Sequence, residues 1–116
     1  MKKILIVDDE SEVRDVLSVF LERKGFETRK CEDGEAALAV LGEDKAFDLV
    51  ILDNRMPGMK GTELISRMRD EGLVIPVILL TGSVGSEEQA AGADMLIRKP
   101  VDLCELVASM NSILKP

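Results

Sequence analysis

The stretch that decides the fold is residues 47–61, FDLVILDNRMPGMKG. Its first half contains an apolar run, residues 49–52, that stops at the carboxylate of Asp53. A run that is apolar on both faces is typical of a central strand in a parallel sheet covered by helices. In open α/β sheets, ligands bind just outside the carboxyl ends of the strands. The sequence therefore predicts that Asp53 lies at a functional edge of such a sheet.

The rest of the chain alternates between strand and helix patterns around this stretch. We expect strands at residues 4–7, 26–31, 48–52, 75–80 and 94–97. Ser11 should cap the first helix, and the other helices should begin near Asp33, at Thr62, at Glu87 and at Asp102. Gly42 should stop the second helix, and the buried face of the first should contain Val13, Val16, Leu17, Phe20 and Leu21. Such alternation predicts a parallel sheet with right-handed crossovers and helices on both faces.

Composition limits the class of protein. The 116 residues make one domain, 1–116, and the 46% hydrophobic and 32% charged content is typical of a globular chain. The net charge of −7 argues against binding nucleic acid. Apolar runs are too short to span a bilayer and no signal segment precedes the first strand, so we expect a cytoplasmic protein without membrane contact. Two distant cysteines fit reduced thiols, and the absence of His excludes a phosphohistidine on this chain.

Polar side chains follow four of the expected strands. Asp8 and Asp9 follow the first strand, Asp53 the third, Thr81 the fourth and Lys99 the fifth. The carboxyl ends of parallel strands share one edge, so these groups should converge. Three converging carboxylates repel one another unless a cation neutralises them. Oxygen ligands without His or Cys suit a hard ion, and Mg²⁺ fits this set.

This constellation contains what phosphoryl transfer to a carboxylate requires. Asp53 supplies the oxygen nucleophile, while Lys99, a cation and the Thr81 hydroxyl offset charge on the transferring group. Each residue alone has a plainer interpretation: the acids after the first strand as a helix N-terminus, Asp53 as a turn residue, Lys99 as a solvated side chain, Thr81 as a loop cap. Their joint position at the ends of four strands favours the phosphoacceptor interpretation.

The order of these motifs resembles a response-regulator receiver domain over essentially the whole chain. The matching residues are Val7-Asp8-Asp9-Glu10, Leu52-Asp53, Met56-Pro57-Gly58, Gly61, Leu80-Thr81-Gly82, Gly92-Ala93-Asp94 and Lys99-Pro100. The resemblance implies a flavodoxin-like (βα)5 domain with five parallel strands in the order 2-1-3-4-5. It implies that Asp53 is phosphorylated, that Thr81 and Lys99 contact the phosphoryl group, and that the protein is a signalling phosphoacceptor rather than an enzyme with a separate substrate.

The resemblance also implies a metal site and a partner. Asp9 would bind Mg²⁺ directly, Asp8 mainly through water, and Asp53 and the backbone carbonyl of Arg55 would complete the ligands. A sensor histidine kinase or phosphotransfer protein would donate the phosphoryl group, docking near the first helix and the site loops. Whether the chain forms a homodimer is left open at this point.

Three features depart from the family's usual pattern. Leu96 stands where an aromatic residue usually couples to the Thr/Ser, so a ring-based switch is not available. The chain between Thr81 and Lys99 is short, and we expect a shortened fourth helix near residues 87–91. Arg55 follows the acceptor by two residues, where its side chain either points to solvent or restricts water attack on a phosphorylated Asp53.

Three other functions compete with this interpretation. A haloacid-dehalogenase-like phosphatase needs its nucleophile at the first strand and a second Asp two residues later, a spacing that residues 8–10 lack. A flavodoxin-type FMN protein needs a hydroxyl- and glycine-rich phosphate loop, whereas these acids would repel a phosphate. A degenerate receiver that serves only as a docking module remains the main alternative, and the chain is either a stand-alone receiver or part of a longer regulator or hybrid kinase.

Overall fold

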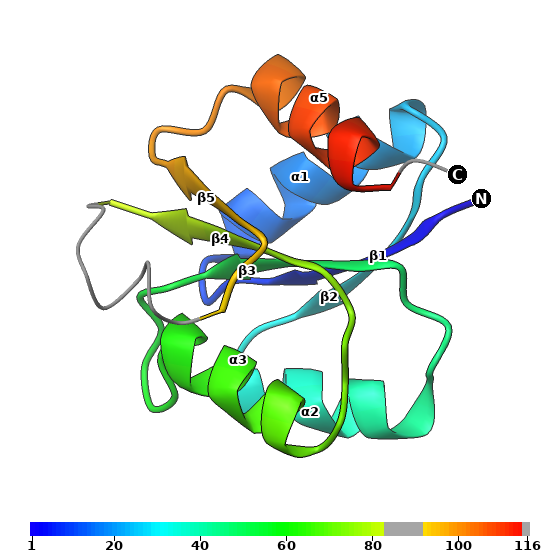
Figure 1. Ribbon diagram of the computed structural model, residues 1–116. Coiled ribbons are helices and arrows are strands. Elements are labelled where there is room, and N and C mark those ends of the chain that lie inside the picture. Colours follow the sequence, from blue (N-terminus) through cyan, green and yellow to red (C-terminus); the bar gives the residue numbers. More distant parts are fainter. Residues whose placement is uncertain (83–91, 115–116) are drawn as a thin grey trace.

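The computed structural model describes residues 1–82 and 92–114 and shows one parallel sheet with helices on both faces (Figure 1). The sheet has the strand order β2-β1-β3-β4-β5, which confirms the predicted order 2-1-3-4-5. The strands are β1 (Lys3–Val7), β2 (Glu27–Cys31), β3 (Leu49–Asp53), β4 (Val77–Thr81) and β5 (Met95–Arg98). The helices are α1 (Ser11–Arg23), α2 (Gly34–Glu43), α3 (Gly61–Asp70) and α5 (Leu103–Ile113). The shortened helix expected at residues 87–91 lies outside the described residues.

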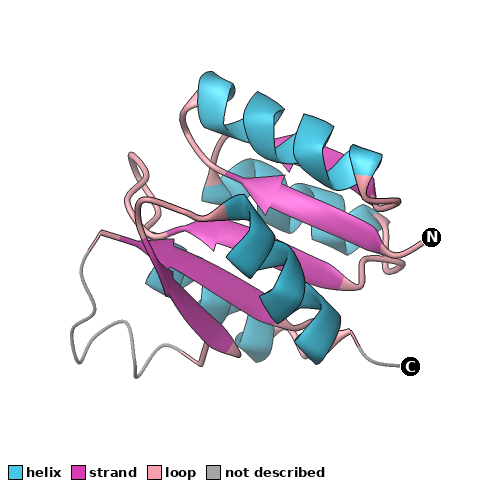
Figure 2. Cartoon of the chain, turned by 90° about the horizontal axis from the view of Figure 1, so that it is seen from above, coloured by secondary structure: helices cyan, strands magenta, loops and turns pink. Residues whose placement is uncertain are grey.

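Helices α1 and α5 cover one face of the sheet, and α2 and α3 cover the other (Figures 1 and 2). Two apolar cores result, because alternate residues of a strand point to opposite faces. In β1, Leu5 and Val7 join the core with α2 and α3, whereas Ile4 and Ile6 join the core with α1 and α5. The central strands β3 and β4 are buried along their whole length, as their apolar runs predicted.

Strand β2 forms one edge of the sheet, as its polar sequence predicted. Glu27, Arg29 and Lys30 are exposed, and the Lys30 ammonium lies 2.8 Å from a carboxylate oxygen of Asp15 on α1. No helix within residues 1–82 and 92–114 has the length and apolar character needed to cross a membrane.

Several local predictions were wrong. Ser11 is not the cap of α1; Glu10 holds that position, and its side chain makes no capping hydrogen bond. Gly42 does not stop α2, which continues to Glu43 and is capped by Asp44. Val16 does not belong to the buried face of α1, because 56% of its surface is exposed.

Strand β4 starts later than expected, at Val77, so Ile75 and Pro76 precede it. The Pro76 carbonyl still accepts a hydrogen bond from the Val50 amide of β3. Pro76 has no N–H of its own to add to the ladder, which explains why regular strand pairing begins after it.

Candidate functional site

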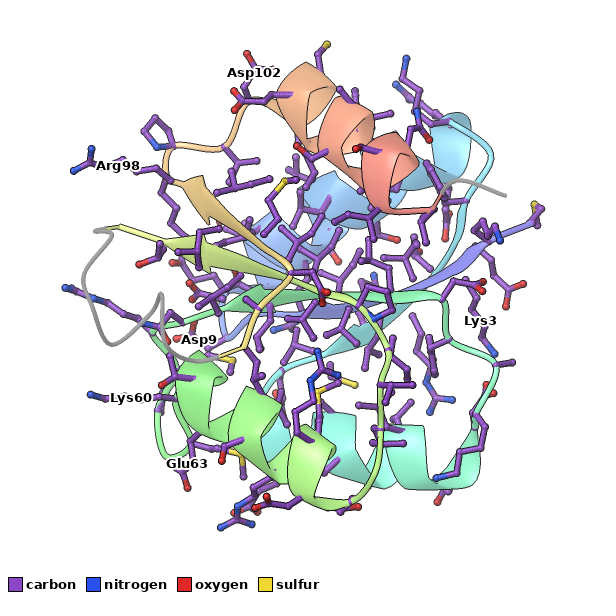
Figure 3. The ribbon with its side chains drawn as sticks, viewed as in Figure 1. Lys3, Asp9, Lys60, Glu63, Arg98 and Asp102 are labelled. Atoms are coloured by element: carbon purple, nitrogen blue, oxygen red, sulfur yellow. The ribbon has the colours of Figure 1, made fainter. Side chains whose placement is uncertain are left out.

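The carboxyl ends of β1, β3, β4 and β5 meet at one edge of the sheet and bring the predicted site residues together. The parallel register pairs Val7 with Leu52 and Asp53 with Leu80. It also pairs Thr81 with Arg98, directly before Lys99. In Figure 3, Asp9 lies at the same end of the molecule as Arg98.

Asp53 is buried at the end of β3 and forms an ion pair with Lys99. Only 2% of its surface is exposed, and its Oδ1 lies 2.7 Å from the Lys99 Nζ. The Lys99 backbone N–H donates to the Thr81 carbonyl over 2.8 Å, which fixes the lysine beside the end of β4. Burial by itself lowers the pKa of Lys99, but the hydrogen bond to Asp53 and the charges of Asp53 and Asp8 raise it above its usual value. Lys99 is therefore a fixed cation at the predicted acceptor.

Asp8 has one satisfied and one unsatisfied carboxylate oxygen. Its Oδ1 accepts a hydrogen bond of 2.9 Å from the Glu10 amide, whereas its Oδ2 is buried and has no hydrogen-bond partner. Burial raises the pKa of Asp8 to about 6, and the negative charge of Asp53 adds to this. A buried carboxylate oxygen without a donor costs free energy unless a cation or water contacts it.

Asp8, Asp9 and Glu10 together form a group of oxygen ligands. One carboxylate oxygen from each lies within 4.8 Å of the other two, and Asp9 and Glu10 are exposed. Asp53 is not a member of this group, but its charge acts on Asp8. The orphaned Asp8 oxygen and the oxygen-only donor set fit Mg²⁺. Glu10 was not among the predicted ligands; the folded structure brings its carboxylate within 4.8 Å of those of Asp8 and Asp9.

The loop after Asp53 is closed by Asn54, a residue that the sequence interpretation missed. The Asn54 Oδ1 accepts from the Thr62 amide over 3.2 Å, and its carbonyl accepts from the Gly61 amide over 3.0 Å. A Cβ on Gly61 would lie 2.7 Å from the Asp53 carbonyl oxygen, so only glycine fits there. The sequence does place an Asn several residues before the helix. Asn54 caps α3 from across a loop, however, and not from the position directly before the helix.

The remaining predicted residues occupy the places that their sequence positions indicated. Thr81 is the last residue of β4 and is buried, with 3% of its surface exposed. Arg55 has an exposed side chain on the loop after β3. Leu96 is half-buried and packs against the core that includes α2 and α3, so the position of the family's usual aromatic residue is filled by an aliphatic side chain.

Comparison with known proteins identifies the family. Residues 4–111 match the response regulator receiver domain. The chain is 42% identical to the phosphate regulon transcriptional regulatory protein PhoB of Pseudomonas aeruginosa, over 98% of this chain and 52% of that protein. It is 36% identical to the sensory transduction protein RegX3 of Mycobacterium bovis, over 99% of this chain and 52% of that protein.

Two solved structures are also similar. Chemotaxis protein CheY4 of Vibrio cholerae superposes with a TM-score of 0.90 at 31% identity, covering 98% of this chain and 99% of that one. Response regulator TrrA of Thermotoga maritima, solved in complex with Mg²⁺-BeF, has a TM-score of 0.88 at 34% identity, covering 98% of this chain and 100% of that one.

The chain belongs to the response regulator receiver domain family. Receiver domains are signalling phosphoacceptors of two-component systems, and they partner with histidine kinases or phosphotransfer proteins. They generally bind Mg²⁺ at an acidic cluster, the kind of group that Asp8, Asp9 and Glu10 form here. The chain spans about half the length of the curated relatives described above.

Proposed function

We propose that Asp53 accepts a phosphoryl group from the phosphohistidine of a sensor histidine kinase or phosphotransfer protein in a Mg²⁺-dependent reaction. The new charge then switches interactions of this domain, 1–116, or of an attached one. The observation that carries this proposal is the buried Asp53 carboxylate, which pairs with Lys99 and whose charge acts on Asp8, a residue with one unsatisfied carboxylate oxygen. We place this reaction in the cytoplasm, without contact to nucleic acid or membrane through this domain.

The reaction transfers the phosphoryl group from nitrogen to oxygen. An Asp53 carboxylate oxygen forms a bond to phosphorus as the phosphorus–nitrogen bond of the donor breaks, and the electron pair of that bond returns to the imidazole ring. Lys99 stays within reach of the transferred group, because its backbone is fixed to Thr81, and offsets its negative charge. The Thr81 hydroxyl donates a hydrogen bond to a phosphoryl oxygen. The transfer needs no external base, since Asp53 attacks as a carboxylate.

A bound Mg²⁺ would supply electrostatic stabilisation of the phosphoryl oxygens. Asp9 and Asp8 would hold it, Asp8 through its unsatisfied oxygen or a water, and Asp53 and the Arg55 carbonyl would be further ligands. Glu10 belongs to the same acidic group and adds negative potential at the exposed side. Before a cation binds, Lys99 is the nearest compensating charge for Asp53.

This chain offers the donor protein a suitable docking surface beside the site. A hollow of about 720 Å³ reaches from Glu10 and Lys99 along α1 to Leu103 on α5. Val16, exposed on α1, lines it together with Val13. An apolar surface of this kind next to Lys99 fits a donor helix that carries a phosphohistidine. The exposed position of Val16, unexpected from periodicity, thus has a use in docking.

A mass measurement tests the proposal. The protein is incubated with Mg²⁺ and acetyl phosphate, and the intact mass is measured for the wild type, for Asp53→Asn and for Asp70→Asn, which changes an exposed carboxylate on α3. We expect one added phosphoryl group on the wild type and on the Asp70 variant, and none on the Asp53 variant. If the wild type gains no mass, with a known receiver domain phosphorylated in parallel, the chain is a docking module instead.

A further inference from the structure

We propose that Arg14 is a positioning residue for the cation site: its guanidinium holds the turn that carries Asp8, Asp9 and Glu10 in the geometry that binds the cation. This inference rests on the proposed function, because it concerns the same cation. Arg14 lies in the second turn of α1 and is half-buried. Its Nη1 donates a hydrogen bond of 2.7 Å to the backbone carbonyl of Asp8, six residues earlier.

Three hydrogen bonds from three parts of the chain hold Asp8. Its amide donates to the Cys31 carbonyl at the end of β2 over 3.2 Å. Its carbonyl accepts from Arg14 on α1, and its Oδ1 accepts from the Glu10 amide of the turn itself. The two backbone bonds fix the peptide planes on both sides of the Asp8 Cα. The third bond fixes the carboxylate, so that Oδ2 is the oxygen left to contact a cation.

The Arg14 side chain ties the start of the acidic turn to helix α1. The Arg14 amide also donates to the Glu10 carbonyl over 3.1 Å, so one residue contacts the turn at its first and its last member. Asp8 and Glu10 thereby keep their separation, and the peptide between Asp8 and Asp9 keeps its orientation. Because the Asp9 side chain is exposed, the orientation of the Asp9 backbone determines where its carboxylate lies.

Arg14 could affect Mg²⁺ binding through its charge or through its hydrogen bond to the turn. These two roles predict opposite changes in Mg²⁺ affinity when Arg14 is replaced. A positive side chain near an acidic cluster repels a cation, so removal of its charge alone would tighten Mg²⁺ binding. Loss of an outer hydrogen bond that orients ligands instead weakens metal binding, by about 10–100-fold in metalloproteins. A weaker affinity after removal of Arg14 is therefore a signature of positioning that an electrostatic role does not produce.

The test compares Arg14→Gln with Arg23→Gln. Both remove one positive charge from α1, but Arg23 is an exposed residue in the last turn of the helix, at the opposite end from the acidic turn. Mg²⁺ affinity is measured by isothermal titration calorimetry, because the chain has no Trp or Tyr for intrinsic fluorescence. Far-UV circular dichroism in urea checks that each variant is folded at the temperature used.

We expect Mg²⁺ to bind Arg14→Gln about tenfold more weakly than the wild type, and Arg23→Gln to retain wild-type affinity to within about twofold. In the metal-free protein, the Glu10 amide should exchange its hydrogen faster in Arg14→Gln than in Arg23→Gln. Equal affinity in the two variants, tighter binding in Arg14→Gln, or an unchanged Glu10 exchange rate overturns the inference. A wild type that binds no Mg²⁺ overturns the proposed function as well, so the two failures are distinguishable.

Discussion

Substitution of Asp8 by Asn should stabilise the metal-free protein while it abolishes the response to Mg²⁺. Asn has the shape of Asp, and its Oδ1 can still accept the hydrogen bond from the Glu10 amide. The substitution removes a buried negative charge whose second oxygen has no partner. It also removes repulsion from Asp53 and Asp9, both of which raise the pKa of Asp8.

The magnitude follows from the shift of that pKa. Its rise from 3.8 to about 6 is roughly 2 pH units, and at ~1.4 kcal/mol per unit this is about 3 kcal/mol lost above pH 6. Between pH 4 and pH 6 the folded protein holds a proton that the unfolded chain has released, so stability falls as the pH rises. Structural relaxation reduces the effect, and we expect Asp8→Asn to gain about 1–3 kcal/mol at pH 7.5 and nothing below about pH 4.

Urea unfolding followed by circular dichroism, with EDTA present, measures this gain at pH 7.5 and at pH 4. A second series at pH 7.5 contains Mg²⁺, which should raise the urea midpoint of the wild type but not that of Asp8→Asn. Asp9→Asn is the control, because it removes the same charge from an exposed side chain and should change the metal-free stability by less than about 0.5 kcal/mol. A loss of stability in metal-free Asp8→Asn at pH 7.5, or an equal gain at pH 4, would refute the reasoning.

Three further predictions concern the surrounding residues. Gly61→Ala should lower the free energy of unfolding, measured in urea, by about 1–3 kcal/mol, because its Cβ would meet the Asp53 carbonyl oxygen at 2.7 Å. As a control, Gly42→Ala should raise that free energy by about 0.5–1 kcal/mol, because Gly42 is helical and a Cβ there would meet nothing within 4 Å. Lys99→Ala should destabilise the metal-free protein by roughly 1–3 kcal/mol and slow phosphorylation by acetyl phosphate, since it leaves the Asp53 carboxylate buried without its cation; equal stability would contradict this. Arg55→Asn should speed autodephosphorylation, timed by intact mass, if the exposed Arg55 side chain restricts water; an unchanged rate removes that role.

The sequence predicted what depends on periodicity and on strand ends. Apolar runs identified the buried strands, and polar residues directly after them identified the edge where Asp53 and Lys99 meet. It did not predict the last residue of α2, Glu43, because the residue that caps the helix is Asp44, whose carboxylate pairs with Lys3 on β1. A contact across 41 residues of sequence is not visible in a local pattern. The tendency of glycine to end helices, applied to Gly42 alone, was therefore a poor guide to the end of that helix.

The site shows the same limit. Carboxylates can be placed at a strand end from sequence, but their differing environments cannot. Asp8 is buried and Asp9 is exposed although they are neighbours with the same side chain. The difference arises because Asp8 continues the alternation of β1 and is held by Cys31, Arg14 and Glu10, which lie in three parts of the chain. Such positioning contacts require the folded structure.

The exposed charges of β2 affect how the domain behaves at high concentration. An edge strand presents unpaired backbone groups with which a strand of another molecule can pair, the first step of many aggregation reactions. Arg29 and Lys30 would have to lose hydration for such pairing, and the Lys30 contact with Asp15 holds one of these charged groups beside the edge. Charged side chains on β2 therefore disfavour extension of the sheet along this edge by a strand of another copy.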